Sequence, residues 1–106
     1  MTTPLYESLV ENYRKYLVSF SNNYLVIKDS HPRYAKMVIN IRNDIYYHKN
    51  DTMRLYNQYI QLLTYLEGLN NDAFYDNNLK YVAMCFDSLA DLCLCMRLIT
   101  SIEKNT

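Results

Sequence analysis

Residues 34–69 read YAKMVINIRNDIYYHKNDTMRLYNQYIQLLTYLEGL, and this stretch decides the fold. After a first step of four residues, its apolar or neutral side chains recur at steps that alternate between three and four. These positions are Tyr34, Val38, Ile41, Ile45, His48, Thr52, Leu55, Tyr59, Leu62, Leu66 and Leu69. A mean period of about 3.5 residues places them along one side of a helix. Because no Gly or Pro lies between Pro32 and Gly68, the stretch predicts one long helix whose apolar stripe is buried against other helices.

The segment from His48 to Thr52 is the ambiguous point of this helix, because the apolar stripe carries polar side chains there. Asn50 or Asp51 can cap a new helix that begins at Thr52, which would give four helices in place of three. The phase of the stripe continues across the segment without a shift. We therefore favour a continuous helix and keep a break near Asn50 as the alternative.

The segment before this stretch repeats the helical period. Thr3 followed by Pro4 is typical of a helix start, because a hydroxyl can cap the first free amides and Pro is tolerated at the first helical position. The apolar positions that follow are Tyr6, Val10, Tyr13, Leu17, Phe20, Tyr24 and Ile27. Pro32 disfavours helical geometry at the residue before it, so residues 29–32 predict a connection in which Asp29 or Ser30 caps the next helix.

The segment after the stretch predicts a last helix. Gly68 and the following Asn residues favour an end to the long helix, and Asn71 or Asp72 can cap the next one. Its main apolar stripe comprises Tyr75, Leu79, Val82, Phe86, Leu89, Cys93, Met96 and Thr100. A second stripe comprises Cys85, Leu92 and Ile99. A helix that is apolar over such a wide arc is expected to pack between two neighbours.

The sequence thus predicts an all-α fold, an antiparallel bundle of three long helices over residues 4–28, 33–68 and 72–102. Four helices result if the long helix breaks near Asn50. The length of 106 residues predicts a single domain over 1–106.

The composition gives few indications of function. The formal net charge is +0, so no strong field directs the protein to nucleic acid or to an anionic membrane. The most apolar segment contains Asp87, Asp91 and Arg97, which would be costly in lipid, so we expect no membrane span. The N-terminal residues show no secretion signal. A bias toward Asn and Tyr is typical of AT-rich coding sequences, and a viral origin is one hypothesis that fits it.

Three cysteines lie in the last helix, at Cys85, Cys93 and Cys95. Cys93 and Cys95 are two residues apart and point to different faces of a helix, so they cannot form a disulfide with each other. We expect reduced, buried thiols and an intracellular location, in the cytoplasm or nucleus. Cys95, which is offset from the main stripe, is the thiol that we expect solvent to reach.

The expected interaction site is the tip of the helical hairpin around Gly68. The first predicted helix is too short to cover the whole length of the other two, which leaves apolar side chains at the tip without a third partner. The predicted interface residues are Tyr59, Leu62, Tyr65, Leu66, Phe74, Tyr75 and Tyr81. Aromatic-rich patches are favoured at protein interfaces. We therefore expect an interaction or assembly module that forms a homo- or hetero-oligomer with a second copy or another protein. Internal coverage, through a bend at Asn50 or a shift of the first helix, is the alternative.

A nucleic-acid-associated function is the second hypothesis. Basic side chains share the N-terminal half with several Tyr and Asn residues, and such a mixture can contact phosphates and stack on bases. The candidate contacts are Lys28, Arg33, Lys36, Arg42 and Lys49. The zero net charge and the scattering of these cations around a helix favour a solvated face instead.

Catalytic and metal-binding motifs are weak in this sequence. Asp87 and Asp91 lie four residues apart on one helix face, but no Gly-rich loop, nucleophile motif or His-centred cluster accompanies them. We expect these carboxylates to pair with basic side chains of a neighbouring helix. The sequence contains no C-x-x-C or H-x-x-x-H pair. We therefore predict no enzymatic activity, no metal site and no cofactor.

Overall fold

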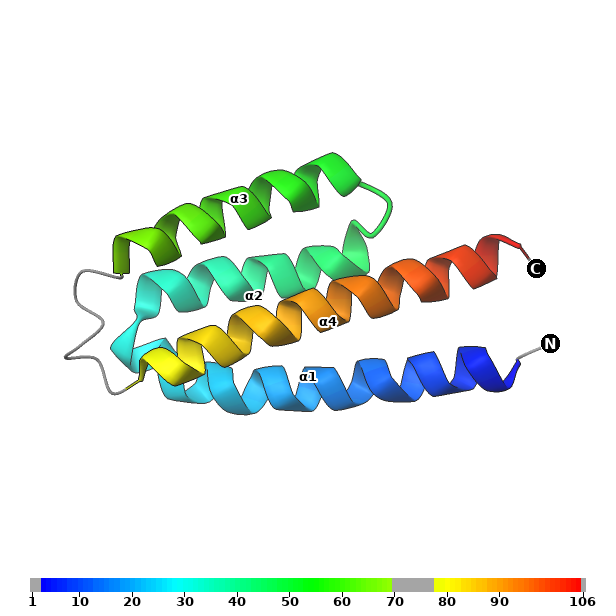
Figure 1. Ribbon diagram of the computed structural model, residues 1–106, viewed down its shortest axis with the longest axis horizontal. Helices are drawn as coiled ribbons and strands as arrows, with labels where there is room; N and C mark the ends of the chain where they lie inside the picture. Colours follow the sequence, from blue (N-terminus) through cyan, green and yellow to red (C-terminus); the bar gives the residue numbers. More distant parts are fainter. Residues whose placement is uncertain (1–2, 70–77, 106) are drawn as a thin grey trace.

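The structure is a computed structural model that describes residues 3–69 and 78–105. Within these ranges it contains four α-helices and no strand (Figure 1). The helices are α1 (Pro4–Ser30), α2 (Pro32–Tyr47), α3 (Thr52–Leu69) and α4 (Leu79–Lys104). The predicted all-α bundle is confirmed, in its four-helix form.

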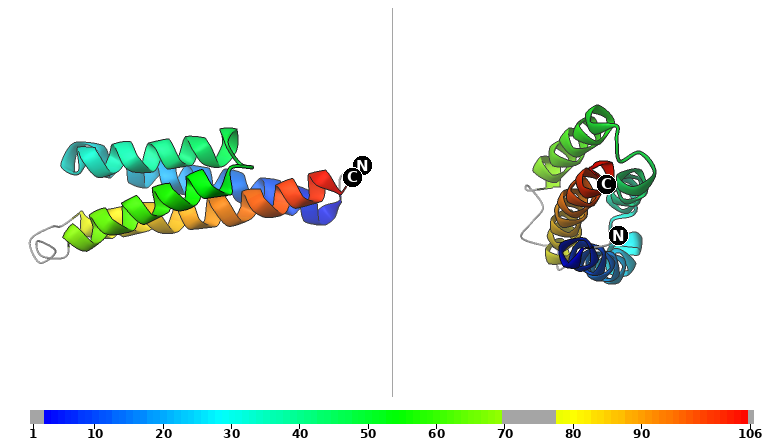
Figure 2. Two further views of the ribbon diagram at one scale, coloured as in Figure 1. Left: turned by 90° about the horizontal axis from the view of Figure 1, so that it is seen from above. Right: turned by 90° about the vertical axis from the view of Figure 1, so that its right-hand side faces the viewer.

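The four helices run alternately in opposite directions, so both chain ends lie at the same end of the bundle (Figure 1). α1 packs along α4, α2 lies behind α4, and α3 lies over α2 and α4 (Figure 2). The bundle measures 51 × 26 × 17 Å, and its radius of gyration is 14.9 Å. A compact domain of this length has a radius of gyration of about 13 Å. The molecule is therefore elongated and thin, and much of each helix lies near the surface.

The first two helices meet at a single residue, His31. The N-cap of α1 is Thr3, whose Oγ1 accepts a hydrogen bond of 3.1 Å from the amide of Tyr6. This cap is as predicted. α1 continues to Ser30, two residues further than expected. α2 starts at Pro32, one residue earlier than expected. The predicted capping of α2 by Asp29 or Ser30 is wrong, because no side chain caps α2 and the hydroxyl of Ser30 contacts His31 Nδ1 instead.

The continuous helix over 33–68 is also wrong, because the chain turns at residues 48–51. Asp51 caps α3 by accepting a hydrogen bond of 3.1 Å from the amide of Arg54, as the alternative prediction required. The turn brings the Asp44 carboxylate to 3.1 Å from Arg54 Nε. In a continuous helix, residues ten positions apart would be separated by about 15 Å along the axis. This contact exists only because α3 folds back along α2.

Asp44 is the polar centre of the α2–α3 hairpin. Its side chain is nearly buried, and it accepts hydrogen bonds from the guanidinium group of Arg54 and from the side-chain Nε2 of Gln58. His48 Nε2 lies 3.8 Å from the same carboxylate. A buried carboxylate is tolerated only when its oxygens are hydrogen-bonded, and Arg54 and Gln58 of α3 supply the donors.

The last helix is described from Leu79 to Lys104. The predicted cap at Asn71 or Asp72 and the predicted interface residues Phe74 and Tyr75 lie outside the described residues. The second expected stripe of α4 is buried, and in the main stripe Val82 and Leu89 are buried while Phe86 and Cys93 are half-buried. The prediction that this helix packs between two neighbours is confirmed by its contacts with α1 and α2.

The core runs along the centre of the bundle. The side chains with no exposed surface are Phe20, Ile27, Tyr34, Val38, Leu62, Val82, Cys85, Leu89 and Leu92. Full burial of each large apolar side chain stabilises the fold by about 1.5–3 kcal/mol. In the part of the chain that the structure covers, no helix has the length and apolar character needed to cross a membrane.

Candidate functional site

The predicted interface stripe mostly closes the bundle instead of remaining uncovered. Leu62 has no exposed surface, so its predicted role as a partner contact is wrong. Tyr65 stacks on Tyr34 of α2 with ring centroids 5.7 Å apart, and Tyr59 packs edge-on against Phe86 of α4 at 5.2 Å. Because α3 folds back over α2 and α4, it supplies the cover that a long straight helix would have lacked.

The remaining predicted interface residues within the described ranges, Leu66 and Tyr81, are half-buried against the core. Tyr81 also lies beneath the ammonium group of Lys80, 4.9 Å from its ring centroid. Internal coverage was the alternative expectation, and it holds for most of the stripe.

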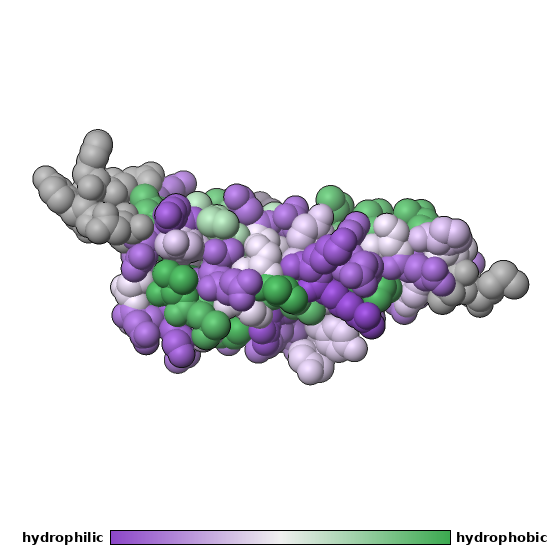
Figure 3. Space-filling model, turned by 90° about the horizontal axis from the view of Figure 1, so that it is seen from below, coloured by the Kyte–Doolittle hydropathy of each residue, from purple (hydrophilic) through white to green (hydrophobic). Residues whose placement is uncertain are grey.

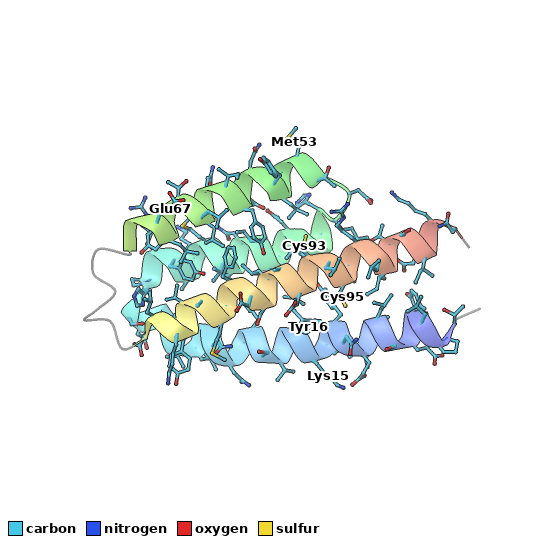
Figure 4. The ribbon with its side chains drawn as sticks, in the orientation of Figure 1. Lys15, Tyr16, Met53, Glu67, Cys93 and Cys95 are labelled. Carbon is cyan, nitrogen blue, oxygen red and sulfur yellow. The ribbon has the colours of Figure 1, made fainter. Side chains whose placement is uncertain are left out.

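The other side of α3 is apolar and exposed. Met53, Tyr56, Ile60 and Leu63 are 67%, 62%, 44% and 40% exposed. Met53 projects away from the bundle at the start of α3 (Figure 4). These residues follow one another at steps of three, four and three, so they form a second apolar stripe on the helix. The sequence contains this spacing. In one continuous helix over residues 34–69, however, the spacing does not show that these four side chains stay exposed.

A groove separates this stripe from α4. We name it the α3–α4 groove, and its volume is about 580 Å³. Its lining comprises Lys49, Thr52, Met53, Leu55, Tyr56, Tyr59, Ile60, Leu63, Cys93 and Arg97. Most of these side chains are apolar, and two cations, Lys49 and Arg97, contribute charge. Small-molecule and peptide sites in proteins commonly combine an apolar lining with a few polar groups.

Tyr59 lines the α3–α4 groove, and its hydroxyl is turned into the protein interior. This hydroxyl is enclosed and has no hydrogen-bond partner among the described residues. Burial raises the pKa of Tyr59 well above its ordinary value, with smaller contributions from Cys93, Asp87 and Asp91. The phenol therefore stays neutral at physiological pH and can act as a hydrogen-bond donor.

The cysteines differ from expectation in their accessibility. Cys93, in the wall of the α3–α4 groove, is half-buried, whereas Cys95 points toward α1 and is 5% exposed (Figure 4). The Cys95 thiol donates a hydrogen bond of 3.5 Å to the carbonyl oxygen of Leu9. The prediction that Cys95 is the accessible thiol is therefore wrong, and Cys93 takes that place. Burial raises the pKa of Cys93, while Arg97 partly lowers it.

A second groove lies between α1, α2 and α4 and has a volume of about 720 Å³. Tyrosine and basic side chains line much of it, among them Tyr6, Tyr13, Arg14, Arg42, Tyr46 and Lys49. Two of these cations already have partners within the protein. Arg42 lies 5.8 Å from the ring centroid of Phe20, and Lys49 Nζ lies 3.9 Å from a carboxylate oxygen of Glu103.

The predicted nucleic-acid contacts do not form one surface. Lys28, Arg33 and Lys36 lie on either side of the α1–α2 bend, and Arg33 lies 5.7 Å from the ring centroid of Tyr65. Arg42 and Lys49 line the second groove, further along the chain. No observation in the described structure favours a nucleic-acid function over a solvated face.

Apolar side chains on the α1 side of the molecule are arranged differently from those of α3. Leu5, Val18 and Leu25 are about as exposed as Tyr56. Figure 3 shows that the hydrophobic groups on this side form small patches between hydrophilic side chains. Scattered exposed apolar residues are ordinary on protein surfaces, whereas contiguous ones mark interaction sites.

The carboxylates of Asp87 and Asp91 are exposed, and neither lines the two grooves. The expected ion pairs with a neighbouring helix are absent from the described residues, so this prediction is wrong. No group of three His, Cys, Asp or Glu side chains that could hold a metal ion occurs in the described ranges.

No protein-family model, curated protein or solved structure matches the chain.

Proposed function

We propose that the protein is a non-enzymatic interaction or assembly module that binds a helix through α3 and α4. The observation that supports this function is the second apolar stripe of α3, Met53, Tyr56, Ile60 and Leu63, which the other described helices leave exposed. The partner is a helix of another protein or of a second copy.

The geometry of the α3–α4 groove suits a helix. An amphipathic helix commonly binds by placing apolar side chains at i, i+3, i+4 and i+7 into an apolar groove between two other helices. Tyr56, Ile60 and Leu63 present the same spacing on one wall, and Cys93 lies on the other. A further helix packed here would complete a three-helix contact with α3 and α4 and remove the exposed apolar surface from water.

The charges of the α3–α4 groove favour a partner with a carboxylate. Lys49 and Arg97 line it, and no acidic side chain does. Lys49 also pairs with Glu103, but Arg97 has no ion-pair partner in the described part of the chain. An acidic side chain of the partner helix placed beside Arg97 would gain a charge pair at the edge of the apolar contact.

Two charged substitutions on adjacent residues of α3 test this function. Ile60→Asp places a carboxylate in the apolar groove, whereas Gln61→Asp places the same charge on an exposed position outside it. We expect Ile60→Asp to abolish binding and Gln61→Asp to retain it. The readouts are light scattering of the purified protein for self-association and affinity capture for other partners. If the wild-type protein neither self-associates nor retains any protein that Ile60→Asp loses, the proposed function is refuted.

A further inference from the structure

The outer side of α4 carries a third stripe of exposed residues. It runs at steps of four, three, four, three and four, and comprises Ala83, Asp87, Ala90, Leu94, Arg97 and Ser101. Leu94 is 60% exposed, the largest exposed fraction among the large apolar side chains of this helix. In the end-on view of Figure 2, α4 lies on the opposite side of the bundle from α2, and no described helix lies beyond it. We name this set the α4 outer stripe.

The α4 outer stripe is symmetric about Leu92, which is buried on the opposite side of the helix. Each position has a counterpart at the same distance on the other side of this residue. Ala90 corresponds to Leu94, and Asp87 corresponds to Arg97. Ala83 corresponds in the same way to Ser101. An acidic residue is thus mirrored by a basic one, and the large side chain by a small one.

This symmetry has a direct structural meaning. When two identical helices pack antiparallel about a twofold axis, every residue faces its mirror position in the other helix. With the axis at Leu92, Asp87 faces the partner's Arg97 and Arg97 faces the partner's Asp87. Leu94 faces the partner's Ala90, where a small side chain leaves room for it. A parallel pair would instead oppose like charges, Asp87 to Asp87 and Arg97 to Arg97.

We propose that the protein forms a twofold-symmetric dimer in which the α4 outer stripe pairs antiparallel with that of a second copy. This inference rests on the proposed function and names the partner. The charge complementarity of the stripe carries it, because neither Asp87 nor Arg97 has an ion-pair partner among residues 3–69 and 78–105. Ala83, Ala90 and Ser101 allow the two helix axes to approach closely, at the lower end of the usual 8–10 Å.

The α3–α4 groove extends the same contact. The twofold axis passes between the two α4 helices, perpendicular to the plane that contains them. Both copies of α3 then lie along the same edge of the interface, so the second stripe of α3 lies next to that of the partner. A stable interface of standard size buries about 800 Å² on each partner. The exposed side chains of Tyr56, Ile60 and Leu63 supply further apolar area. We expect a dissociation constant in the micromolar range.

Charge reversal at the two positions tests the antiparallel pairing. We expect Asp87→Arg and Arg97→Asp each to weaken dimerisation about tenfold or more, because each opposes like charges at both symmetric positions. The double variant restores the opposite-charge pairs, so its dissociation constant should return to within about threefold of the wild type. A mixture of the two single variants should form a heterodimer. Asp29→Arg, at an exposed position of α1, makes the same charge change as a control and should have no effect.

Analytical ultracentrifugation of these proteins across the micromolar range gives the dissociation constants. Restoration by the double variant, together with heterodimer formation, supports the antiparallel dimer. A monomeric wild type, or a double variant that is as weak as the single ones, overturns it. If the wild type is monomeric but captures a protein that Ile60→Asp does not capture, the dimer is refuted and the proposed function stands. If neither is observed, both fail.

Discussion

The phenolic hydroxyl of Tyr34 donates a hydrogen bond of 3.0 Å to the carbonyl oxygen of Val82, in a region where neither side chain has exposed surface. The contact ties α2 to α4 through the centre of the core. Tyr34→Phe removes the donor and keeps the ring. We expect it to lower the free energy of unfolding by about 1 kcal/mol, the usual net contribution of such a hydrogen bond. Urea denaturation followed by circular dichroism measures this change.

Tyr47→Phe is the matched control, because Tyr47 is 75% exposed. It should change the free energy of unfolding by less than about 0.5 kcal/mol. Equal stability of the wild type and Tyr34→Phe would show that the buried hydrogen bond contributes nothing.

Asp44 supports the turn between α2 and α3 through its bonds to Arg54 and Gln58. Asp44→Ala leaves two donors on α3 without their acceptor. We expect the free energy of unfolding to fall by about 1.5–3 kcal/mol, as for hydrogen bonds to a charged group. Amide hydrogen exchange should also become faster at the start of α3. Asp29→Ala, which removes an exposed carboxylate, is the control; if it destabilises the protein as much as Asp44→Ala, the role of the buried network is disproved.

The turn at residues 48–51 shows where the sequence pattern is insufficient. Helix type, the first cap at Thr3 and the bend at Pro32 follow from local chemistry, and each was predictable. The phase of the apolar stripe did not distinguish a continuous helix from a hairpin, because a four-residue turn replaces about one helical turn. What stabilises the hairpin is a contact between Asp44 and Arg54 that forms only after the chain has folded back. No periodicity within one helix reports such a contact.

The same turn explains why the predicted interface residues of α3 differ from the apolar residues that are exposed. Most of the apolar surface that the first helix cannot cover is covered by α3. The prediction assigned the exposed role to Leu62, which is buried, while Ile60 and Leu63 remain exposed. Which of two apolar stripes faces inward depends on the direction in which α3 lies over α2 and α4, and that direction is set by the turn.

Leu62 and Leu63 are adjacent leucines with opposite environments, 0% and 40% exposed. Leu62→Ala leaves a cavity in the core and should lower the free energy of unfolding by about 2–4 kcal/mol. Leu63→Ala should cost less than about 1 kcal/mol and should instead weaken any assembly that uses the α3–α4 groove. Denaturation midpoints of the two variants provide the comparison. Equal losses of stability would contradict the position of α3 in the bundle.

Thiol labelling tests the positions of the three cysteines. Cys93 is half-buried at the α3–α4 groove, whereas Cys85 and Cys95 are 0% and 5% exposed. With a maleimide reagent under native conditions, we expect Cys93 to react first and the other two to react only when the protein unfolds. Cys93→Ala should therefore lack the fast phase. A fast phase that persists in Cys93→Ala would place Cys85 or Cys95 at the surface.

The buried thiol of Cys85 and the buried phenol of Tyr13 predict a loss of stability at alkaline pH. Burial raises the pKa of the Cys85 thiol from 9.0 to about 12, and it raises that of Tyr13 from 10.0 to about 12 against a lowering effect of Arg42. Above pH 9 the unfolded chain loses these protons while the folded protein keeps them, so the unfolded state binds fewer protons and stability falls as pH rises. The contribution is fully present below about pH 9 and is lost toward pH 12, with a slope of at most about 1.4 kcal/mol per pH unit for each group.

Cys85→Ala separates the two groups. The variant should be less stable at neutral pH by about 1 kcal/mol, since a buried side chain is truncated. Its stability should nevertheless fall less steeply than that of the wild type just above pH 9. In this range the unfolded chain loses the thiol proton of Cys85 before the phenol proton of Tyr13. Urea midpoints in a reducing buffer at a series of pH values measure both slopes. Because the thiol stays neutral only in the packed core, parallel slopes for the two proteins would mean that Cys85 is not enclosed between the helices.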